Sequence, residues 1–234
     1  MHARPSRHQR LALLVGLAAA CAITATASAG TINGQVRYTG APVQRKRIPV
    51  SIDQYLCGTE KTADDLLLSP KNGVQNAVVS VQGLPGAKWK RDLSPVKMDQ
   101  KKCDFVPRIV LVPAGGTVEF LNSDRLLHNV RSDAKENPAF NRAQPHGRTI
   151  TITFRSPEIL RVDCDLHSWM RGWVVVTEHP FYAITDADGN FALENVPPGK
   201  YTLQVWHETL GKATQDVTVT DATPATVTVN MQRK

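Results

Sequence analysis

Residues 162–176 read VDCDLHSWMRGWVVV, a short loop that carries a thiol, an imidazole and a thioether between two strand-like segments. Cys164, His167 and Met170 follow one another at intervals of three residues, in a chain that has only four cysteines and four methionines. Helical spacing would place the three side chains on one face, but the flanking residues are β-branched and typical of strands. We therefore expect these side chains to surround a tight loop between two strands.

The rest of the chain shares this strand character. Helical periodicity is nearly absent, and short β-branched segments, most of them alternating, are separated by clusters of Gly, Pro, Asn and Asp. Many short strands at such spacing predict an all-β fold built as a sandwich or a barrel. The expected strands are residues 31–38, 76–83, 107–112, 116–122, 148–154, 159–164, 172–178, 190–196, 200–208, 215–221 and 225–231.

The first residues predict a secretory signal peptide. A basic start is followed by a short apolar run and by small residues, with Ala27 and Ala29 placed for cleavage. The apolar run is too short for a membrane span, which needs about 20 residues. Acylation of Cys21 in a lipoprotein is the alternative, but its apolar context lacks the usual preceding leucine. We expect residues 1–29 to be removed and the mature protein to be periplasmic or secreted, without a membrane span.

The charge balance indicates no nucleic-acid partner. The formal net charge of the whole chain is +7, and loss of three of its 28 basic residues with the signal leaves 25 against 21 acidic residues, a net +4. The basic residues are spread along the chain, which is typical of a solvated surface. Docking to an acidic partner is the alternative interpretation, and nucleic acid is not expected outside the cytoplasm.

The cysteine count predicts one disulfide and one free thiol. Loss of Cys21 leaves Cys57, Cys103 and Cys164. In an oxidising compartment an odd number of cysteines leaves one thiol unpaired. We predict a Cys57–Cys103 disulfide, with Cys164 free for another use.

A candidate metal site joins the loop at 164–170 to an earlier histidine. His128 lies in a strand–loop segment 36 residues before Cys164. Two imidazoles and a thiolate, with a distant thioether, form the donor set of a mononuclear type 1 (blue) copper site. The spacing therefore predicts one copper ion held by His128, Cys164 and His167, with Met170 as a weak axial ligand.

Other kinds of site fit these residues less well. Zinc takes four strong tetrahedral donors, a dinuclear copper centre needs a second cysteine near Cys164, and an iron–sulfur cluster needs more thiolates. A Cys–His nucleophile pair has no obvious third group to orient it. A zinc-protease interpretation of WHETLGK, residues 206–212, fails because Gly211 stands in place of the second histidine. His146, His179 and His207 have no such context, and we expect them in turns or on the surface.

The region around this constellation resembles the cupredoxin family, above all plastocyanins and amicyanins. The matching segments are GTVEFLNSDRLLHNV at 116–130, GRTITITF at 147–154, and CDLHSWM with RGWVVV at 164–176. The resemblance covers about residues 74–178. It implies a Greek-key β-barrel that carries single electrons.

The resemblance also assigns roles around the ligands. It implies that Asn129 hydrogen-bonds across to the cysteine-bearing loop. It implies that His167 is exposed and serves as the electron port, with Trp169 and Trp173 adding apolar contact surface. The chain departs from the family by an N-terminal β extension at 30–73 and by Asp165 and Leu166 in place of the usual Thr-Pro of the ligand loop.

The C-terminal part, residues 179–234, resembles the carboxypeptidase regulatory-like, transthyretin-like β-sandwich module. The matching residues are TDADGNFALENVPPGKYTLQV at 185–205. In that family the module is not catalytic and is a spacer or adhesion unit. Residues 31–43 and 76–81 also fit its opening strands, so the copper domain is either in tandem with the module or inserted into it.

These observations predict a periplasmic blue copper protein that exchanges electrons with a redox partner, such as a cytochrome or a dehydrogenase. We do not expect an enzyme, because a saturated type 1 site has no position for substrate. Copper storage, delivery or sensing is one alternative. A structural or adhesion β-protein is the other.

Overall fold

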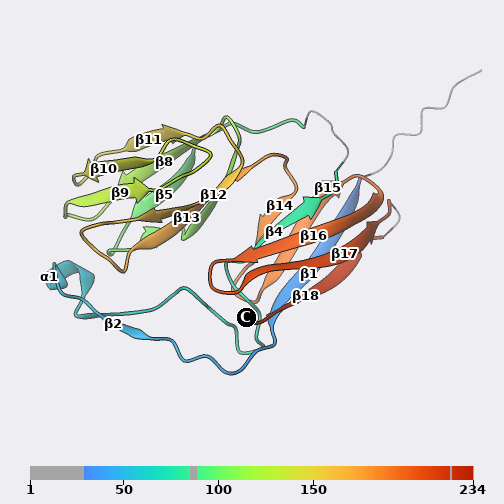
Figure 1. Ribbon diagram of the computed structural model, residues 1–234, viewed down its shortest axis with the longest axis horizontal. Helices are drawn as coiled ribbons and strands as arrows, with labels where there is room; N and C mark the ends of the chain where they lie inside the picture. Colours follow the sequence, from blue (N-terminus) through green and yellow to red (C-terminus); the bar gives the residue numbers. More distant parts are fainter. Residues whose placement is uncertain (1–28, 85–88, 222, 234) are drawn as a thin grey trace, which may run out of the picture.

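The computed structural model describes residues 29–84, 89–221 and 223–233, which form 18 strands and one single-turn helix (Figure 1). The all-β class is therefore confirmed. The predicted signal peptide, residues 1–29, lies outside the described residues except for its last residue, Ala29. Within the described ranges, no helix has the length and apolar character needed to cross a membrane.

The strands near the two ends of the chain form one unit, which we call the terminal sandwich. Its first sheet has the order β15-β1-β18 and its second the order β14-β4-β16-β17. The strands are β1 (Gly30–Tyr38), β4 (Val78–Gln82), β14 (Tyr182–Ile184), β15 (Asn190–Val196), β16 (Gly199–His207), β17 (Gly211–Val219) and β18 (Ala225–Met231). Alternate residues such as Tyr201, Leu203 and Val205 of β16 are buried, as the period of two requires.

The middle of the chain forms a second unit, the central sandwich. Its two sheets have the orders β10-β9-β12-β13-β7 and β11-β8-β5-β6. The strands are β5 (Val96–Gln100), β6 (Phe105–Val106), β7 (Ile109–Pro113), β8 (Thr117–Asn122), β9 (His128–Ser132), β10 (Phe140–Gln144), β11 (Ile150–Thr153), β12 (Glu158–Asp163) and β13 (Arg171–Thr177).

The central sandwich has its own hydrophobic core between the two sheets. Met98 and Phe120 from one sheet and Val130 and Val162 from the other are all 0% exposed and belong to one cluster. The expected barrel thus takes the form of two sheets packed face to face, with parallel pairs β5–β8 and β7–β13 beside antiparallel ones.

In the sequence, the central sandwich is inserted between two strands of the terminal sandwich. β4 and β14, the strands before and after it in the chain, pair with each other in one sheet. β1 pairs with β15 and β18. The expected ranges placed β1 in an extension at 30–73 and β4 in the copper domain at 74–178, whereas both strands pair with C-terminal strands. This is the inserted arrangement: the C-terminal strands pair with β1 and β4, which precede the central sandwich in the sequence.

A polar and aromatic contact joins the two sandwiches. The Arg108 guanidinium, which precedes β7, donates to both carboxylate oxygens of Glu208, which follows β16, at 2.6 and 3.0 Å. Trp173 packs against Trp206 with ring centroids 4.8 Å apart. Trp173 therefore does not add to the surface near His167, because its side chain faces the other sandwich.

Between β1 and β4 the chain runs out to the far end of the central sandwich and back (Figure 1). This excursion contains β2 (Arg47–Pro49), α1 (Gln54–Cys57) and β3 (Glu60–Thr62), with β2 and β3 paired antiparallel. Val50 is 2% exposed and lies in the central core. We call residues 50–62 the strap.

His179 and His207, which we expected in turns or on the surface, are both buried. His179 is 7% exposed and His207 is 2% exposed, whereas His146 lies on the surface as expected. His207 ends β16, and its Nδ1 accepts from the backbone N–H of Thr209 at 3.2 Å. His179 lies in the bend between β13 and β14, so the expected turn is found there. The expectation for His207 was wrong, because His207 continues the alternation of Tyr201, Leu203 and Val205 on the buried face of β16.

His207→Asn should flatten the pH dependence of stability in mild acid. Burial, the largest cause, lowers the pKa of His207 from 6.5 to about 4. Because the pKa of His207 is lower in the folded state than in the unfolded state, its contribution to the free energy of unfolding is complete above pH 6.5. This contribution is lost as the pH falls toward 4. That loss amounts to roughly 3 kcal/mol of unfolding free energy. Denaturant unfolding at pH 7 and pH 4.5 measures it, and equal pH dependence in both proteins would contradict the assignment.

Candidate metal centre

Three of the four predicted ligands meet at one end of the central sandwich. His128 is the first residue of β9, and Cys164 follows the last residue of β12. The two strands are antiparallel neighbours with Arg131 opposite Asp163, so the start of β9 lies beside the end of β12. The loop after β12 then carries His167 across the same end of the sandwich before β13 begins.

The donor atoms converge. His128 Nδ1 lies 3.0 Å from His167 Nδ1, and Cys164 Sγ lies 3.8 Å from the first nitrogen and 3.6 Å from the second. Metal–donor bonds of about 2.0–2.3 Å around a trigonal ion separate the donors by about 3.5–3.8 Å. The two sulfur–nitrogen distances match this range and the nitrogen–nitrogen distance is shorter. The arrangement fits one ion bound by all three side chains.

A carboxylate binds the outer nitrogen of each imidazole. His128 Nε2 lies 3.0 Å from Asp124 Oδ2, and His167 Nε2 lies 3.1 Å from Asp53 Oδ2. A carboxylate only accepts hydrogen bonds, so in each neutral ring the proton is on Nε2 and the lone pair is on Nδ1. The two lone pairs then face each other beside the Cys164 sulfur. A cation bound among them would relieve their repulsion.

Burial affects the protonation of two of the donors, His128 and Cys164. Both imidazoles are 0% exposed and Cys164 is 2% exposed. Burial lowers the pKa of His128, although the hydrogen bond to Asp124 opposes this effect. Burial also raises the pKa of the Cys164 thiol. A metal ion therefore finds the His128 imidazole neutral, and it must displace the thiol proton of Cys164.

Met170 closes the ligand loop. Its backbone N–H donates to the carbonyl of His167 at 2.8 Å, and its own carbonyl accepts from the backbone N–H of Cys164 at 3.4 Å. The side chain is 1% exposed and belongs to the central core. Its role as axial ligand stays a prediction.

Asn129 connects the two ligand-bearing segments. Its Oδ1 accepts from the backbone N–H of Asp165 at 2.7 Å and from the Cys164 thiol at 3.3 Å. Its Nδ2 donates to Asp165 Oδ2 at 3.0 Å and to Asn141 Oδ1 at 2.9 Å. The residue after the first histidine thus holds the cysteine-bearing loop by its side chain.

The disulfide between Cys57 and Cys103 is confirmed, and Cys164 is a free buried cysteine. The bond joins α1 of the strap to the turn between β5 and β6. A second group of possible donors, formed by Cys103, Asp124 and His128, lies beside the first. The Cys103 sulfur is already bonded in the disulfide, so this second group lacks a thiolate.

The expectation that His167 is an exposed electron port was wrong. Its side chain is 0% exposed, because Asp53 of the strap covers its outer nitrogen and the Trp169 ring packs beside it with centroids 5.2 Å apart. Trp169 also donates from Nε1 to the Cys103 carbonyl at 3.0 Å, so it is part of this cover.

Sequence reasoning missed both carboxylates. Asp124 lies four residues before His128, and an acidic residue so close to a candidate ligand is a signal that could have been used. Asp53 lies 114 residues before His167, and nothing local connects the two.

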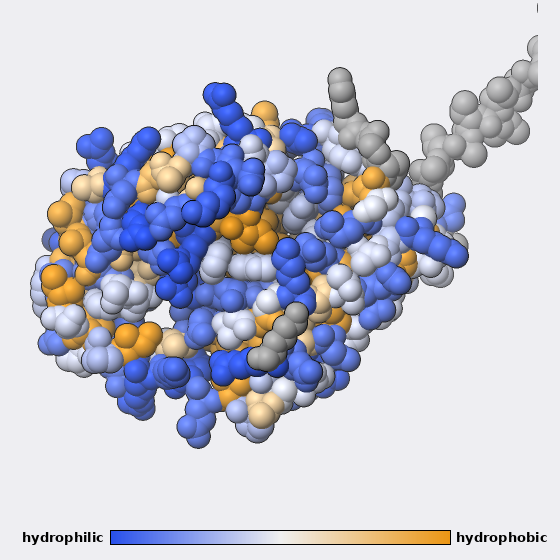
Figure 2. All heavy atoms as spheres, viewed as in Figure 1, coloured by the Kyte–Doolittle hydropathy of each residue, from blue (hydrophilic) through white to orange (hydrophobic). Residues whose placement is uncertain are grey.

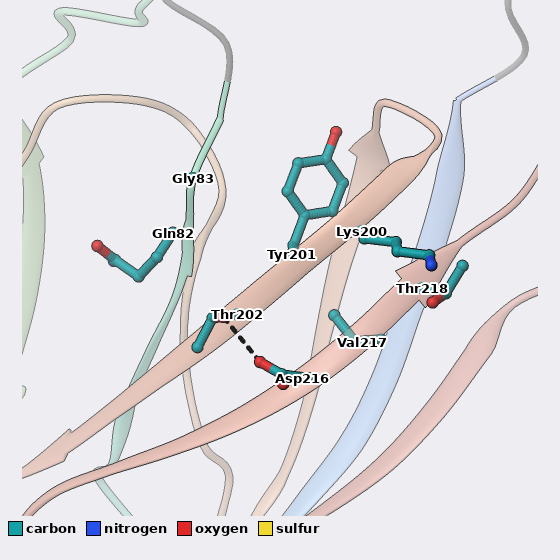
Figure 3. A pocket seen from close by; sticks show the side chains of 8 residues that line it. All are labelled: Gln82, Gly83, Lys200, Tyr201, Thr202, Asp216, Val217 and Thr218. Carbon is teal, nitrogen blue, oxygen red and sulfur yellow. Dashed lines mark hydrogen bonds between the residues drawn. The ribbon is translucent and has the colours of Figure 1, made fainter.

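The candidate metal centre is distinct from the surface hollow drawn in Figure 3. That hollow lies on the terminal sandwich and is lined by residues from the end of β4, from β16 and from β17. Its labelled side chains include one internal contact, in which Thr202 donates to Asp216 at 2.8 Å. It contains no histidine or cysteine, and we assign no chemistry to it.

Residues 173–232 match the family model of the carboxypeptidase regulatory-like domain. This match confirms the predicted resemblance of the C-terminal strands. A comparison with curated proteins found no match.

Part of the chain is similar to solved copper-protein structures. A Cu-containing nitrite reductase from Thermus scotoductus is 29% identical over 41% of this chain and 25% of its own, with a TM-score of 0.35. A purple cupredoxin from Nitrosopumilus maritimus is 21% identical over 35% of this chain and 99% of its own, with a TM-score of 0.31. Amicyanin from Paracoccus versutus is 23% identical over 42% of this chain and 97% of its own, with a TM-score of 0.34. The chain thus spans about a quarter of the nitrite reductase.

Proposed function

We propose that this protein is a type 1 copper protein that carries single electrons between redox partners outside the cytoplasm. One observation carries the proposal. His128 Nδ1, His167 Nδ1 and Cys164 Sγ converge within 3.8 Å of one another in a buried site, and each imidazole has its other nitrogen on a carboxylate. Such a set of lone pairs and one thiol is suited to binding a metal cation.

The donor types favour copper over zinc. Two imidazoles and one thiolate are three strong donors, and the fourth candidate in the loop, Met170, offers a thioether, which is a soft ligand that zinc seldom takes. A trigonal His₂Cys set with a weak axial thioether is typical of electron-transfer copper. Bound copper would supply a one-electron couple that protein side chains lack.

The surrounding residues hold the donors in one geometry. Asp124 and Asp53 fix the two rings, and Asn129 fixes the cysteine loop. Both imidazoles are fully buried, so no water reorganises around them when the charge changes. A site that keeps the same geometry in two charge states exchanges electrons with a small reorganisation cost.

The surface around the site supports contact with a protein partner. Large hydrophobic side chains are exposed there, with Ile52 at 45%, Tyr55 at 79%, Leu127 at 51% and Leu166 at 44%. Each lies one or two residues from a ligand or from its carboxylate. Figure 2 shows hydrophobic residues among hydrophilic ones at the left end of the molecule, where α1 lies in Figure 1. We propose that a redox protein, such as a cytochrome or a dehydrogenase, docks on this end.

Copper titration followed by visible absorption tests the function. We expect an intense thiolate-to-copper charge-transfer band that saturates at one copper per chain. The control is zinc titration, which should bind without colour. A colourless Cu(II) complex at saturation would contradict the proposal.

A redox cycle of the loaded protein separates electron carriage from storage or delivery. A carrier should be reduced and re-oxidised repeatedly with its copper retained. Loss of the copper to a chelator on reduction would instead indicate delivery.

A further inference from the structure

The strap, residues 50–62, is fastened to the central sandwich at three of its residues. Val50 is buried in the central core, and Cys57 is bonded to Cys103. Lys61 Nζ donates to the Lys102 carbonyl and to Asp104 Oδ2, both at 2.6 Å. Three separate attachments thus hold a segment that makes little regular secondary structure.

The turn that carries Cys57 also places Asp53 on His167. Asp53 precedes α1 with a φ of 53°, in the left-handed region that residues other than glycine seldom adopt. Its carbonyl accepts from the backbone N–H groups of Leu56 and Cys57 at 3.0 and 2.9 Å. Its carboxylate reaches His167 Nε2 at 3.1 Å.

The turn that carries Cys103 places Asp124 on His128. Lys102 and Cys103 have consecutive positive φ values of 54° and 57°, and both direct their N–H groups at one carboxylate. Asp124 Oδ1 accepts from Lys102 N at 2.6 Å, and its Oδ2 accepts from Cys103 N at 2.7 Å. The same Oδ2 lies 3.0 Å from His128 Nε2. Unusual backbone geometry on both sides of the disulfide therefore coincides with contacts to the two imidazoles.

We propose that the disulfide-tethered strap and the 102–103 turn form one device that gives each copper-binding imidazole a positioning carboxylate. Asp53 acts on His167 and Asp124 acts on His128, and the Cys57–Cys103 bond joins the two. The inference rests on the proposed copper function. It goes beyond that function because it assigns the N-terminal segment a part in setting the properties of the metal.

The carboxylates act in two ways. Each fixes the tautomer and orientation of its ring, so Nδ1 faces the metal position. Each also adds a negative charge behind a ligand, and this charge favours the more positively charged oxidised copper over the reduced ion. Removing either charge should therefore raise the reduction potential.

If the strap only excluded water from the metal centre, the charge of Asp53 would not affect the reduction potential. Asp53→Asn separates this role of the strap from the electrostatic role of its carboxylate. The variant keeps the size of the side chain and an oxygen that accepts from His167 Nε2, but it loses the charge. Glu60→Gln is the matched control, because Glu60 lies on the same strap and pairs with Arg47 rather than with an imidazole. Both variants remove one negative charge from the same segment.

Redox titration of the copper-loaded wild type and both variants is the test. We expect Asp53→Asn to raise the reduction potential while it retains the visible band, and Glu60→Gln to leave the potential unchanged. Asp53→Ala should in addition weaken copper binding about 10- to 100-fold, the usual effect of losing an outer partner of a ligand. The Cys57→Ser/Cys103→Ser double variant should shift the potential in the same direction as Asp53→Asn.

Two contrary results are distinguishable. If the wild type shows the visible band but Asp53→Asn shifts the potential no more than Glu60→Gln, this inference is overturned and the copper function stands. If the wild type shows no band, the proposed function fails and the inference fails with it. Histidine ¹⁵N NMR of the metal-free protein adds a readout that needs no copper: the His167 Nε2–H tautomer should dominate in the wild type and lose its preference in Asp53→Ala.

Discussion

Cys164→Ser should abolish the visible band of the copper-loaded protein and should weaken copper binding by more than the roughly 100-fold that loss of an outer partner costs. The band arises from charge transfer between a thiolate and copper, and Cys164 is the free cysteine of the described residues. Serine fills nearly the same volume but offers a harder oxygen donor, which copper binds less well in this setting. Absorption spectroscopy and competition with a copper chelator measure both effects.

Ser168→Ala is the control for that substitution. Ser168 lies in the same loop and is exposed, and it is not among the grouped donors. The variant should keep the band and the affinity of the wild type. A Cys164→Ser protein that retained the intense band would show that the colour arises elsewhere.

Glu208→Ala should lower the free energy of unfolding by about 3 kcal/mol, near the low end for breaking a buried ion pair. The Arg108 and Glu208 side chains are 9% and 6% exposed, so the variant leaves a buried guanidinium without its bidentate partner. Asp64 still pairs with Arg108, which keeps the effect near that lower limit. Denaturant unfolding at neutral pH measures the change.

The exposed pair formed by Arg47 and Glu60 is the comparison. Their side chains are 77% and 43% exposed. Glu60→Ala should change the stability by less than about 1 kcal/mol, because solvent screens such a pair. Equal losses of unfolding free energy in Glu208→Ala and Glu60→Ala would contradict the expectation that the buried ion pair contributes more to stability than the exposed one.

Much of the fold could be predicted because the strands carry local signals. β8 and β16 alternate buried and partly exposed residues, and their sequences show the same alternation. The pairing of β1 with β18 could not be predicted in this way. That parallel contact joins residues nearly 200 positions apart, and a strand pattern does not name its partner.

In the candidate site, too, the local features could be predicted from the sequence and the long-range contacts could not. The spacing of Cys164, His167 and Met170 is local, and it was visible in the sequence. The cover over His167 was not, because the position of Asp53 depends on a disulfide and on a long excursion of the chain between β1 and β4. The family resemblance suggested an exposed imidazole, and the strap replaces solvent with a carboxylate.

The most direct test of the account is a crystal structure of the copper-loaded protein, with anomalous scattering collected at the copper edge. We predict a single strong peak bonded to His128 Nδ1, His167 Nδ1 and Cys164 Sγ, with both Nε2 atoms still on their carboxylates. A peak elsewhere, or copper bound through Nε2 of either ring, would contradict the account.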